Sequence, residues 1–389
     1  MSRIGELITE LCPDGVEYFA VAELFDLRNG YTPSKSNPLF WVDGEIPWFR
    51  MEDLRENGGV LSTAMQQIPE VAVKGGKLFP ANSLLVATSA TIGEHALITV
   101  PHLSNQRFTS LSPKSSFIDR LDMKFAYYYG FVLDSWCLNN TTTSSFASVD
   151  MSGFKKFRFP VPPLEIQREI VRILDTFSRM EAELEAELEA RKQQYDYFRS
   201  QLMVENNQAD KVFLGEIASI GTGSHDTKDA LSDGEFVFYA RGREPLRLDT
   251  FDFDEDAIIT AGDGVGVGKV FHFASGKYAL HQRAYRIVPS ANVVARYLYH
   301  YLRADFSRYL ERTSVHASVT SLRRPMFLKY PVALPSMEEQ QDIVDTLDAF
   351  DALVNDLSVG LPAELAARRQ QYEYYRDKLL TFKELETAS

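Results

Sequence analysis

The sequence predicts an α+β protein made of two mixed α/β globules in tandem, separated by two long helices. Three observations predict this fold. A stretch with a helical apolar period runs from residue 164 to 202, a closely similar stretch forms the C-terminus, and the region before each one is rich in glycine, proline and β-branched residues. Two similar units in one chain indicate a duplication. The repeat is expected to be pseudo-twofold, because a duplicated chain imitates a symmetric dimer.

The two helical stretches resemble each other along their length. The first reads Q-R-E-I-V-R-I-L-D-T-F from Gln167, and the second reads Q-Q-D-I-V-D-T-L-D-A-F from Gln340. Apolar residues recur every three or four positions, which is typical of coiled-coil helices. Because a single long helix cannot bury such a stripe on itself, we expect the copies to pack together. The predicted interface residues are Ile170, Phe177, Leu184, Leu188, Tyr195, Leu202, Leu347, Phe350, Leu357, Leu365, Tyr372 and Leu379.

The second helical stretch contains two residues that disfavour a continuous helix. Gly360 and Pro362 lie in a segment that is longer than its counterpart in the first copy. Proline lacks an amide hydrogen and clashes with the preceding turn of a helix. The sequence therefore predicts a break near residues 358–362.

Length and composition set limits on the class of protein. A chain of 389 residues with 45% hydrophobic residues has room for two or three packed domains. No apolar run is long enough to span a bilayer, and acidic residues interrupt the apolar pattern of the N-terminus, so the sequence predicts a cytoplasmic protein without a secretory signal. Cys12 and Cys137 are too few for a disulfide scaffold and are expected to be buried thiols.

The net charge of −13 does not exclude nucleic acid as a ligand. Most of the acidic excess lies in the helical stretches, whereas the two globules are close to neutral and have room for local basic faces. The distribution of charge, and not the total, is therefore the relevant quantity.

Short sequence patterns predict the elements of each globule. A short amphipathic helix is expected within residues 1–15, strands at 83–87 and 94–100, and a helix at 121–138. The second globule repeats the first in four places, which pair residues 22–27 with 215–220, 83–93 with 257–268, 105–107 with 281–283, and 146–149 with 316–319.

No catalytic or metal-binding motif is recognised. Residues 263–269 are glycine-rich, but they lack the first glycine and the final Ser or Thr of a phosphate loop and the third glycine of a dinucleotide fingerprint, so they predict a tight turn between strands. The histidines show no metal-ligand spacing, and the acidic run 252–256 is interpreted as a solvated turn. We therefore expect no catalytic residue and no metal, and a duplicated chain without such motifs favours recognition over catalysis.

The globules carry side chains suited to DNA grooves. Arginine, glutamine and hydroxyl side chains contact base edges and phosphates, although single arginines and threonines on loops are ordinarily only solvated. The duplication gives a reason to consider them together. The predicted DNA-binding residues are Tyr31, Thr32, Ser34, Lys35, Arg50, Ser89, Thr91, Gln106 and Arg107 in the first globule, and Ser224, His225, Arg241, Arg243, Lys269, Gln282 and Arg283 in the second.

The order of these elements resembles the specificity subunit of type I restriction-modification systems. The motifs that carry the resemblance are C-P-D-G-V-E-Y from Cys12, Gly30-Tyr-Thr-Pro33, Ile46-Pro-Trp48, Ile92-Gly93 with Asn105-Gln106, and the proline-rich segments before Gln167 and Gln340. The second globule departs from this pattern, because Gly223-Ser-His-Asp226 replaces Gly30-Tyr-Thr-Pro33 and no Pro-Trp pair follows.

The resemblance implies two target-recognition domains, each of which reads one half of a bipartite asymmetric double-stranded DNA site. Two antiparallel conserved helices would hold them apart and dock two modification (methyltransferase) subunits, which restriction/translocase subunits join. S-adenosylmethionine, ATP and magnesium are expected in those partners and no cofactor in this chain. The implied division is a short helix at 1–15, recognition domains at 16–160 and 206–331, and long helices at 161–205 and 332–389.

Two other functions stay open on the sequence alone. The alternative is a coiled-coil structural adaptor whose globules bind protein or carbohydrate rather than DNA. A hydrolase with an unrecognised site ranks last, because no residue pattern indicates its chemistry.

Overall fold

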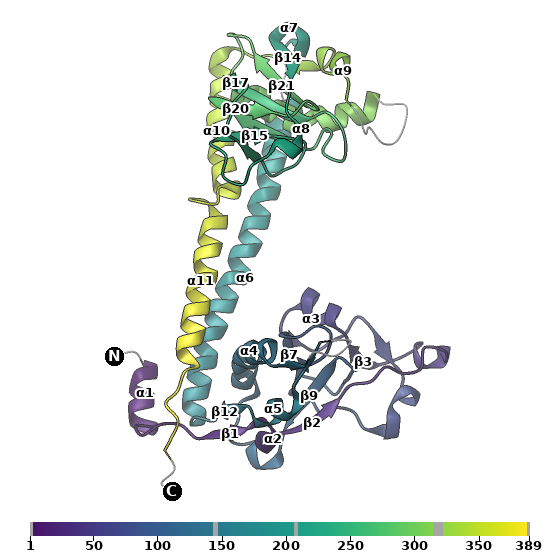
Figure 1. Ribbon diagram of the computed structural model, residues 1–389, viewed down its shortest axis with the longest axis vertical. Helices are drawn as coiled ribbons and strands as arrows, with labels where there is room; N and C mark the ends of the chain where they lie inside the picture. Colours follow the sequence, from purple (N-terminus) through teal and green to yellow (C-terminus); the bar gives the residue numbers. More distant parts are fainter. Residues whose placement is uncertain (1–2, 143–146, 206–208, 314–321, 387–389) are drawn as a thin grey trace. The chain divides into compact units, whose positions relative to one another are not determined.

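A computed structural model describes residues 3–142, 147–205, 209–313 and 322–386 (Figure 1). The chain divides into two compact units. The first comprises Met1–Glu181 with Arg368–Ser389, and the second comprises Ala182–Ala367. Each unit therefore contains one globule together with parts of the long helices.

The long helices follow the predicted apolar stripes. Helix α6 spans Leu164–Ser200, with its first half in the first unit and its second half in the second, and a π-helical turn continues it over Gln201–Glu205. Helices α10 (Met337–Asn355) and α11 (Leu361–Leu379) form the second copy. In the first unit α6 and α11 lie side by side (Figure 1), and Phe177 pairs with Tyr375 while Glu181 pairs with Arg369. This order of contacts shows that the two helices are antiparallel.

The predicted break in the second copy is confirmed. It covers residues 356–360, where the Asp356 carboxylate accepts a hydrogen bond from the Ser358 amide at 2.7 Å and a tight turn forms. A Cβ on Gly360 would lie 2.4 Å from the Ala352 carbonyl oxygen, so only glycine fits this turn. Pro362 follows at the second position of α11, where its missing amide hydrogen costs no helical bond.

Most predicted interface residues are at least half-buried. Ile170, Tyr195, Leu347 and Leu365 are buried, and Phe177, Leu184, Leu188, Leu202, Phe350, Tyr372 and Leu379 are half-buried. Leu357 requires a correction, because it lies in the 356–360 turn with 83% of its side chain exposed. The turn removes it from the helical stripe.

The first unit is built on a five-stranded and a three-stranded sheet, with the large helix α4 (Met123–Asn139) packed against β6 and β7. The five-stranded sheet has the order β2 (Phe25–Asn29), β9 (Phe108–Pro113), β6 (Ser83–Ala87), β7 (His95–Ile98) and β4 (Val60–Leu61). The three-stranded sheet has the order β5 (Gln67–Ile68), β3 (Ile46–Phe49) and β8 (Leu103–Ser104). The strands and helix predicted at 83–87, 94–100 and 121–138 are therefore present.

Smaller elements complete the first unit. They are α1 (Arg3–Leu11), which was predicted, α2 (Val21–Leu24), α3 (Met51–Asn57), α5 (Met151–Lys156), the strand pairs β1 (Tyr18–Ala20) with β12 (Arg158–Pro160) and β10 (Thr141–Thr142) with β11 (Ser148–Val149), and 3-10 turns at Pro38–Phe40, Glu70–Ala72, Lys74–Gly76 and Ser115–Phe117.

The second unit has two four-stranded sheets. One has the order β14 (Ala218–Thr222), β21 (Ala284–Pro289), β18 (Ala257–Ala261) and β19 (Phe271–Ala274). The other has the order β16 (Leu246–Leu248), β15 (Phe236–Tyr239), β20 (Lys277–Leu280) and β17 (Phe253–Asp254). The remaining elements are α7 (Leu214–Ile217), α8 (Ala295–Thr313), α9 (Arg324–Leu328), the pair β13 (Lys211–Phe213) with β22 (Pro331–Ala333), and a 3-10 turn at Thr227–Asp229.

The two units share a core topology, to which β4 adds a strand beside β7 in the first unit and β17 adds a strand beside β20 in the second. Strand β6 pairs antiparallel with β7 and β9 as β18 does with β19 and β21, and β3 runs parallel to β8 as β15 does to β20. The predicted α+β class and internal repeat are confirmed. The proposed pairing of 146–149 with 316–319 lies in part outside the described residues, because 146 and 316–319 are not described.

A buried glutamine ties each globule to its long helix in the same way. Gln167 accepts a hydrogen bond from the Asp122 amide at 2.8 Å and donates to the carbonyl oxygens of Arg120 and Pro162. In the second unit Gln340 accepts from the Val294 amide at 2.8 Å, and its amide group donates to the carbonyl oxygens of Asn292 and Pro335. Both side chains are at most 1% exposed.

A second contact lies further along each helix. Asp175 accepts hydrogen bonds from Tyr128 at 2.6 Å and Lys124 at 2.7 Å. At the matching position Asp348 contacts Nε2 of His300 at 2.7 Å and pairs with Arg296. Each globule is therefore held to its helix at two points, whose geometry is repeated although the partner residues differ.

We predict that Gln167→Leu loosens only the first unit and Gln340→Leu only the second. Each change leaves buried backbone groups without partners and should lower the local free energy of opening by about 3 kcal/mol. Hydrogen-exchange mass spectrometry on α4 and α8 peptides would measure this. Gln341→Leu, at an exposed neighbouring position, is the control and should change little. Equal acceleration in both helices would contradict the prediction.

We also predict that His300 makes the second unit sensitive to acid. Burial lowers the pKa of His300 to about 4, although its hydrogen bond to Asp348 acts in the opposite direction. Between pH 6.5 and pH 4 the unfolded chain therefore takes up a proton that the folded chain does not. Stability present at pH 7 should fall by about 3 kcal/mol across this window.

Urea unfolding of wild type and His300→Gln between pH 7 and pH 4 would measure the effect. The glutamine keeps a donor for Asp348 but does not titrate. Burial also lowers the pKa of His102 to about 4 in the first unit, so the difference between the two proteins, and not the slope of either, isolates His300. Parallel stability curves would contradict the prediction.

Candidate nucleic-acid interface

One polar triplet occupies the same place in both units. Residues 105–107 connect β8 to β9, and residues 281–283 connect β20 to β21. The Arg107 carbonyl accepts from the Thr88 amide at 2.9 Å, and the Arg283 carbonyl accepts from the Gly262 amide at 2.9 Å. Arg107 and Arg283 therefore lie at equivalent backbone positions, and both are exposed.

The first unit surrounds its triplet with neutral polar groups. Thr32 donates a hydrogen bond to Gln106, and the Tyr31 amide donates to the Ser104 carbonyl at 2.8 Å. A Cβ on Gly30 would lie 2.0 Å from the Asn105 carbonyl oxygen, so glycine is required for this close approach. The structure thus brings Tyr31 and Thr32 next to the triplet.

The other predicted DNA-binding residues of the first unit differ in their distance from the triplet 105–107. Arg50 follows Phe49, whose carbonyl accepts from the Asn105 amide at 3.1 Å, and the Arg50 Nε is buried without a hydrogen-bond partner. Ser89 and Thr91 lie in the loop that follows β6. Ser34 bonds to Ser36 at 2.8 Å, and Lys35 is exposed. No contact joins Ser34 or Lys35 to the triplet among the described residues.

The second unit surrounds its triplet with carboxylates. Asp263 pairs with Arg241 at 2.8 Å and with Arg283 at 3.2 Å. Burial acts to raise the pKa of Asp263, but hydrogen bonds and charge from the two arginines outweigh it and lower the pKa below its usual value. One carboxylate thus holds two predicted DNA-binding arginines together, while 62% of the Arg283 side chain stays exposed.

Two further carboxylates complete this region. Asp226 accepts a hydrogen bond from Gln282 at 3.1 Å. Asp252 accepts from Ser224 at 3.2 Å and from the Leu280 amide at 2.8 Å, and it lies 3.2 Å from His225 Nε2. The sequence interpretation of Asp252 as part of a solvated turn is therefore wrong, since this carboxylate is a hydrogen-bonding centre.

No local sequence pattern indicates these acidic neighbours. Asp226, Asp252 and Asp263 are separated from their partners by at least 20 residues, and only the sheet topology brings them together. Arg243 and Lys269, which were predicted with them, are exposed on the loops after β15 and β18.

The glycine-rich segment 263–269 lies in the connection between the paired strands β18 and β19, as predicted, but the connection is longer than a tight turn. A Cβ on Gly266 would lie 2.7 Å from the Arg241 carbonyl oxygen, which explains one of the glycines. Val265 at the tip is 99% exposed. Gly266 therefore serves close backbone packing beside Arg241, whereas Gly264 and Gly268 adopt the positive φ that favours glycine.

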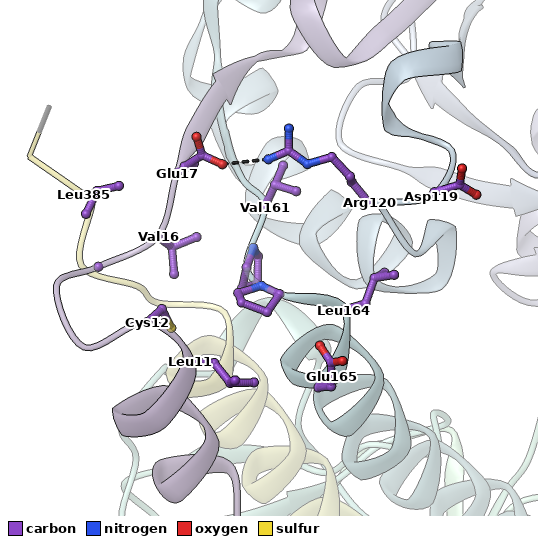
Figure 2. A pocket seen from close by; sticks show the side chains of 13 residues that line it. Leu11, Cys12, Val16, Glu17, Asp119, Arg120, Val161, Leu164, Glu165 and Leu385 are labelled. Atoms are coloured by element: carbon purple, nitrogen blue, oxygen red, sulfur yellow. Dashed lines mark hydrogen bonds and ion pairs between the residues drawn. The ribbon is translucent and has the colours of Figure 1, made fainter.

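A separate pocket of about 540 Å³ lies in the first unit (Figure 2). Its lining includes Cys12, Val161 and Leu164, with Glu17 and Arg120 paired at 2.6 Å. Burial raises the pKa of Cys12, so its thiol is protonated at neutral pH and is a poor nucleophile. The pocket offers an ion pair and apolar walls, and no activated nucleophile.

In the described part of the chain, no cluster of three or more His, Cys, Asp or Glu residues is placed to hold a metal ion. No helix in the same ranges is long and apolar enough to cross a bilayer.

A family model described as "Type I restriction modification DNA specificity domain" matches residues 13–191 and 206–367. The chain belongs to this family. Each matched range contains one of the two globules together with part of the long helices.

Curated relatives agree with this assignment. The chain is 42% identical over 381 residues to the EcoprrI specificity subunit of Escherichia coli, and the match covers 92% of this chain and 93% of the relative. It is 32% identical over 304 residues to the EcoR124I/EcoR124II specificity subunit of Escherichia coli, covering 69% and 72%. These comparisons give no support to the structural-adaptor alternative.

Solved structures share the fold. A chain from a study of complex assembly and conformational transition of the type I R-M system matches with a TM-score of 0.66 at 17% identity, covering 95% of this specificity subunit and 98% of that chain. The S subunit from M. genitalium matches with a TM-score of 0.55 at 16% identity, covering 94% and 96%.

Proposed function

We propose that this chain is the non-catalytic subunit that reads a bipartite, asymmetric double-stranded DNA site for a type I restriction-modification enzyme. One observation carries the proposal. Arg107 and Arg283 lie at the same point of a repeated β framework, but the side chains around them differ in charge. A common frame with different surroundings suits two readers of two different half-sites.

The surroundings indicate different base preferences. Thr32 and Gln106 in the first unit are neutral and both donate and accept hydrogen bonds. Asp226 and Asp252 in the second unit accept hydrogen bonds only, and carboxylates accept from the amino group of cytosine. The arginines supply contacts to phosphate or guanine in both. The predicted DNA-binding residues that lie further from the triplets remain candidates for phosphate contacts.

The division into domains follows from this proposal. Residues 16–160 and 206–331 would be the target-recognition domains, with 161–205 and 332–389 as the helical segments that dock partners. Two methyltransferase subunits and the restriction/translocase subunits would bind there and supply S-adenosylmethionine, ATP and magnesium. The chain would act in the cytoplasm, where it meets the DNA that it reads.

The proposal is tested by mapping methylated bases in the DNA of a host that carries the whole system. We expect one motif made of two dissimilar half-sites at a fixed gap, which disappears when the gene for this chain is deleted. Methylation without a bipartite motif would contradict the proposal.

Charge reversal at the triplets should affect one half-site at a time. Arg107→Glu should relax or abolish selection at one half-site, and Arg283→Glu at the other, because each removes a contact in one unit only. Binding of the assembled complex to oligonucleotides with either half-site scrambled would measure this, at several salt concentrations. Each variant serves as the control for the other. Equal losses at both half-sites would show that the units do not read separately.

A further inference from the structure

In each unit, the loop that follows the central strand of the larger sheet begins beside a triplet arginine. In the first unit the Thr88 amide donates a hydrogen bond to the Arg107 carbonyl at 2.9 Å, and the Thr88 carbonyl accepts one from the Val149 amide at 2.9 Å. These two bonds fix the backbone at the point where Ser89 begins the loop after β6. Ser89 is half-buried and carries only a neutral hydroxyl group.

The second unit repeats this backbone arrangement with a carboxylate. The Gly262 amide donates to the Arg283 carbonyl at 2.9 Å, and the Gly262 carbonyl accepts from the Leu322 amide at 2.7 Å. The residue after Gly262 is Asp263, which is therefore equivalent to Ser89. The same frame thus holds a neutral side chain in one unit and an acidic side chain in the other.

Asp263 changes the electrostatic surroundings of Arg283. Its Oδ1 accepts a hydrogen bond from Arg241 at 2.8 Å, and its Oδ2 accepts one from Arg283 at 3.2 Å. Burial acts to raise the pKa of Asp263, but the two arginines lower the pKa below its usual value, so the carboxylate is ionised at neutral pH. Two guanidinium groups and one carboxylate leave a single positive charge. The cluster still attracts DNA, but a phosphate that approaches Arg283 also meets a fixed negative charge.

A guanine edge suits such an arginine better than a phosphate does. Guanine presents O6 and N7 as neutral acceptors in the major groove, and the Asp263 carboxylate does not repel them as it repels a phosphate. The Arg283 guanidinium has further N–H donors besides the one that Asp263 accepts, and 62% of the side chain is exposed. The hydrogen bond also restrains the guanidinium, so less conformational entropy is lost when a base binds.

Arg107 has the opposite surroundings. Its amide donates to the Asn105 side chain at 2.9 Å, whereas its guanidinium forms no ion pair with any residue that the structure describes. The side chain is exposed, and Ser89 places no negative charge beside it. Its full charge is therefore available to a phosphate, and each phosphate that a protein neutralises adds to the salt dependence of binding.

We propose that Asp263 is a specificity-determining residue that makes Arg283 a reader of guanine and keeps it from phosphate. The equivalent Ser89 leaves Arg107 free to neutralise phosphate. Asp263 is a positioning residue, because it acts through Arg283 and not by touching DNA. This inference rests on the proposed function, and it assigns a base to the second unit, whose half-site should contain a guanine that Arg283 contacts.

The test uses the full chain assembled with its methyltransferase subunits and duplexes that carry the mapped site. Fluorescence anisotropy at about 50 to 200 mM salt gives the slope of log Kd against log salt concentration. Arg107→Ala should reduce this slope by about 1. Arg283→Ala should leave the slope unchanged and should lower the preference for one guanine by about tenfold, as measured with duplexes in which each base pair of the half-site is replaced.

Exchanging the charge at the two equivalent positions tests the carboxylate itself. Asp263→Asn keeps the size of the side chain but removes its charge. It should lower the preference for the same guanine by about tenfold and steepen the slope by about 1, because Arg283 becomes available to phosphate. Ser89→Asp should reduce the slope by about 1, because a carboxylate then lies beside Arg107.

Asp233→Asn is the control for net charge. It removes the same charge from an exposed position of the second unit and should change neither the slope nor the guanine preference. The inference is wrong if Asp263→Asn keeps both at wild-type values, or if Asp233→Asn has the same effect as Asp263→Asn. Should Asp263→Asn fail to fold, the slopes of Ser89→Asp and Arg283→Ala decide, and a wild-type slope for Ser89→Asp overturns the inference.

Failure of this inference is distinguishable from failure of the proposed function. If methylation mapping gives a bipartite motif but Arg283→Ala reduces the slope as much as Arg107→Ala does, only the inference fails. If mapping gives no such motif, the proposed function fails. Slopes on random-sequence duplexes then still decide the role of the carboxylate, since steepening by Asp263→Asn supports it and an unchanged slope overturns it.

Discussion

The hydrogen bonds of one buried amide, repeated once, hold this architecture together. Gln167 and Gln340 each bind the backbone at the start of α4 or α8 and the proline-rich segment before their own helix. An amide buried with its donors and acceptors satisfied is costly to displace, since each group that loses its partner carries a desolvation penalty. The attachment of each globule to its helix is therefore specified by geometry as well as by apolar packing.

Beyond that attachment, the two units retain the same sheet core but differ in the loops that the sheets carry. The core of the β framework is the same in both units, because its central strands β6 and β18 are buried and their register is set by packing. The loops around Arg107 and Arg283 have no such constraint, and one is neutral where the other is acidic. A specificity subunit needs this separation, since its targets differ while its framework does not.

The exposed residues of the long helices have diverged between the two copies at one end and have been retained at the other. Near Gln167 and Gln340 the exposed residues have diverged, whereas around Tyr197 and Tyr374 they have not. Comparing the two copies within this chain therefore shows which exposed positions have been retained since the duplication.

The sequence by itself determined the duplication, the helical stripes, the break before Pro362 and the placement of a polar triplet in each globule. These features depend on local periodicity and on glycine and proline stereochemistry, which are written in neighbouring residues. It could not determine the turn that exposes Leu357, the carboxylates beside Arg241 and Gln282, or the glutamine attachments, whose partners lie tens of residues away. Only the tertiary structure decided those contacts, because the pairing of distant strands and helices chooses which polar groups meet.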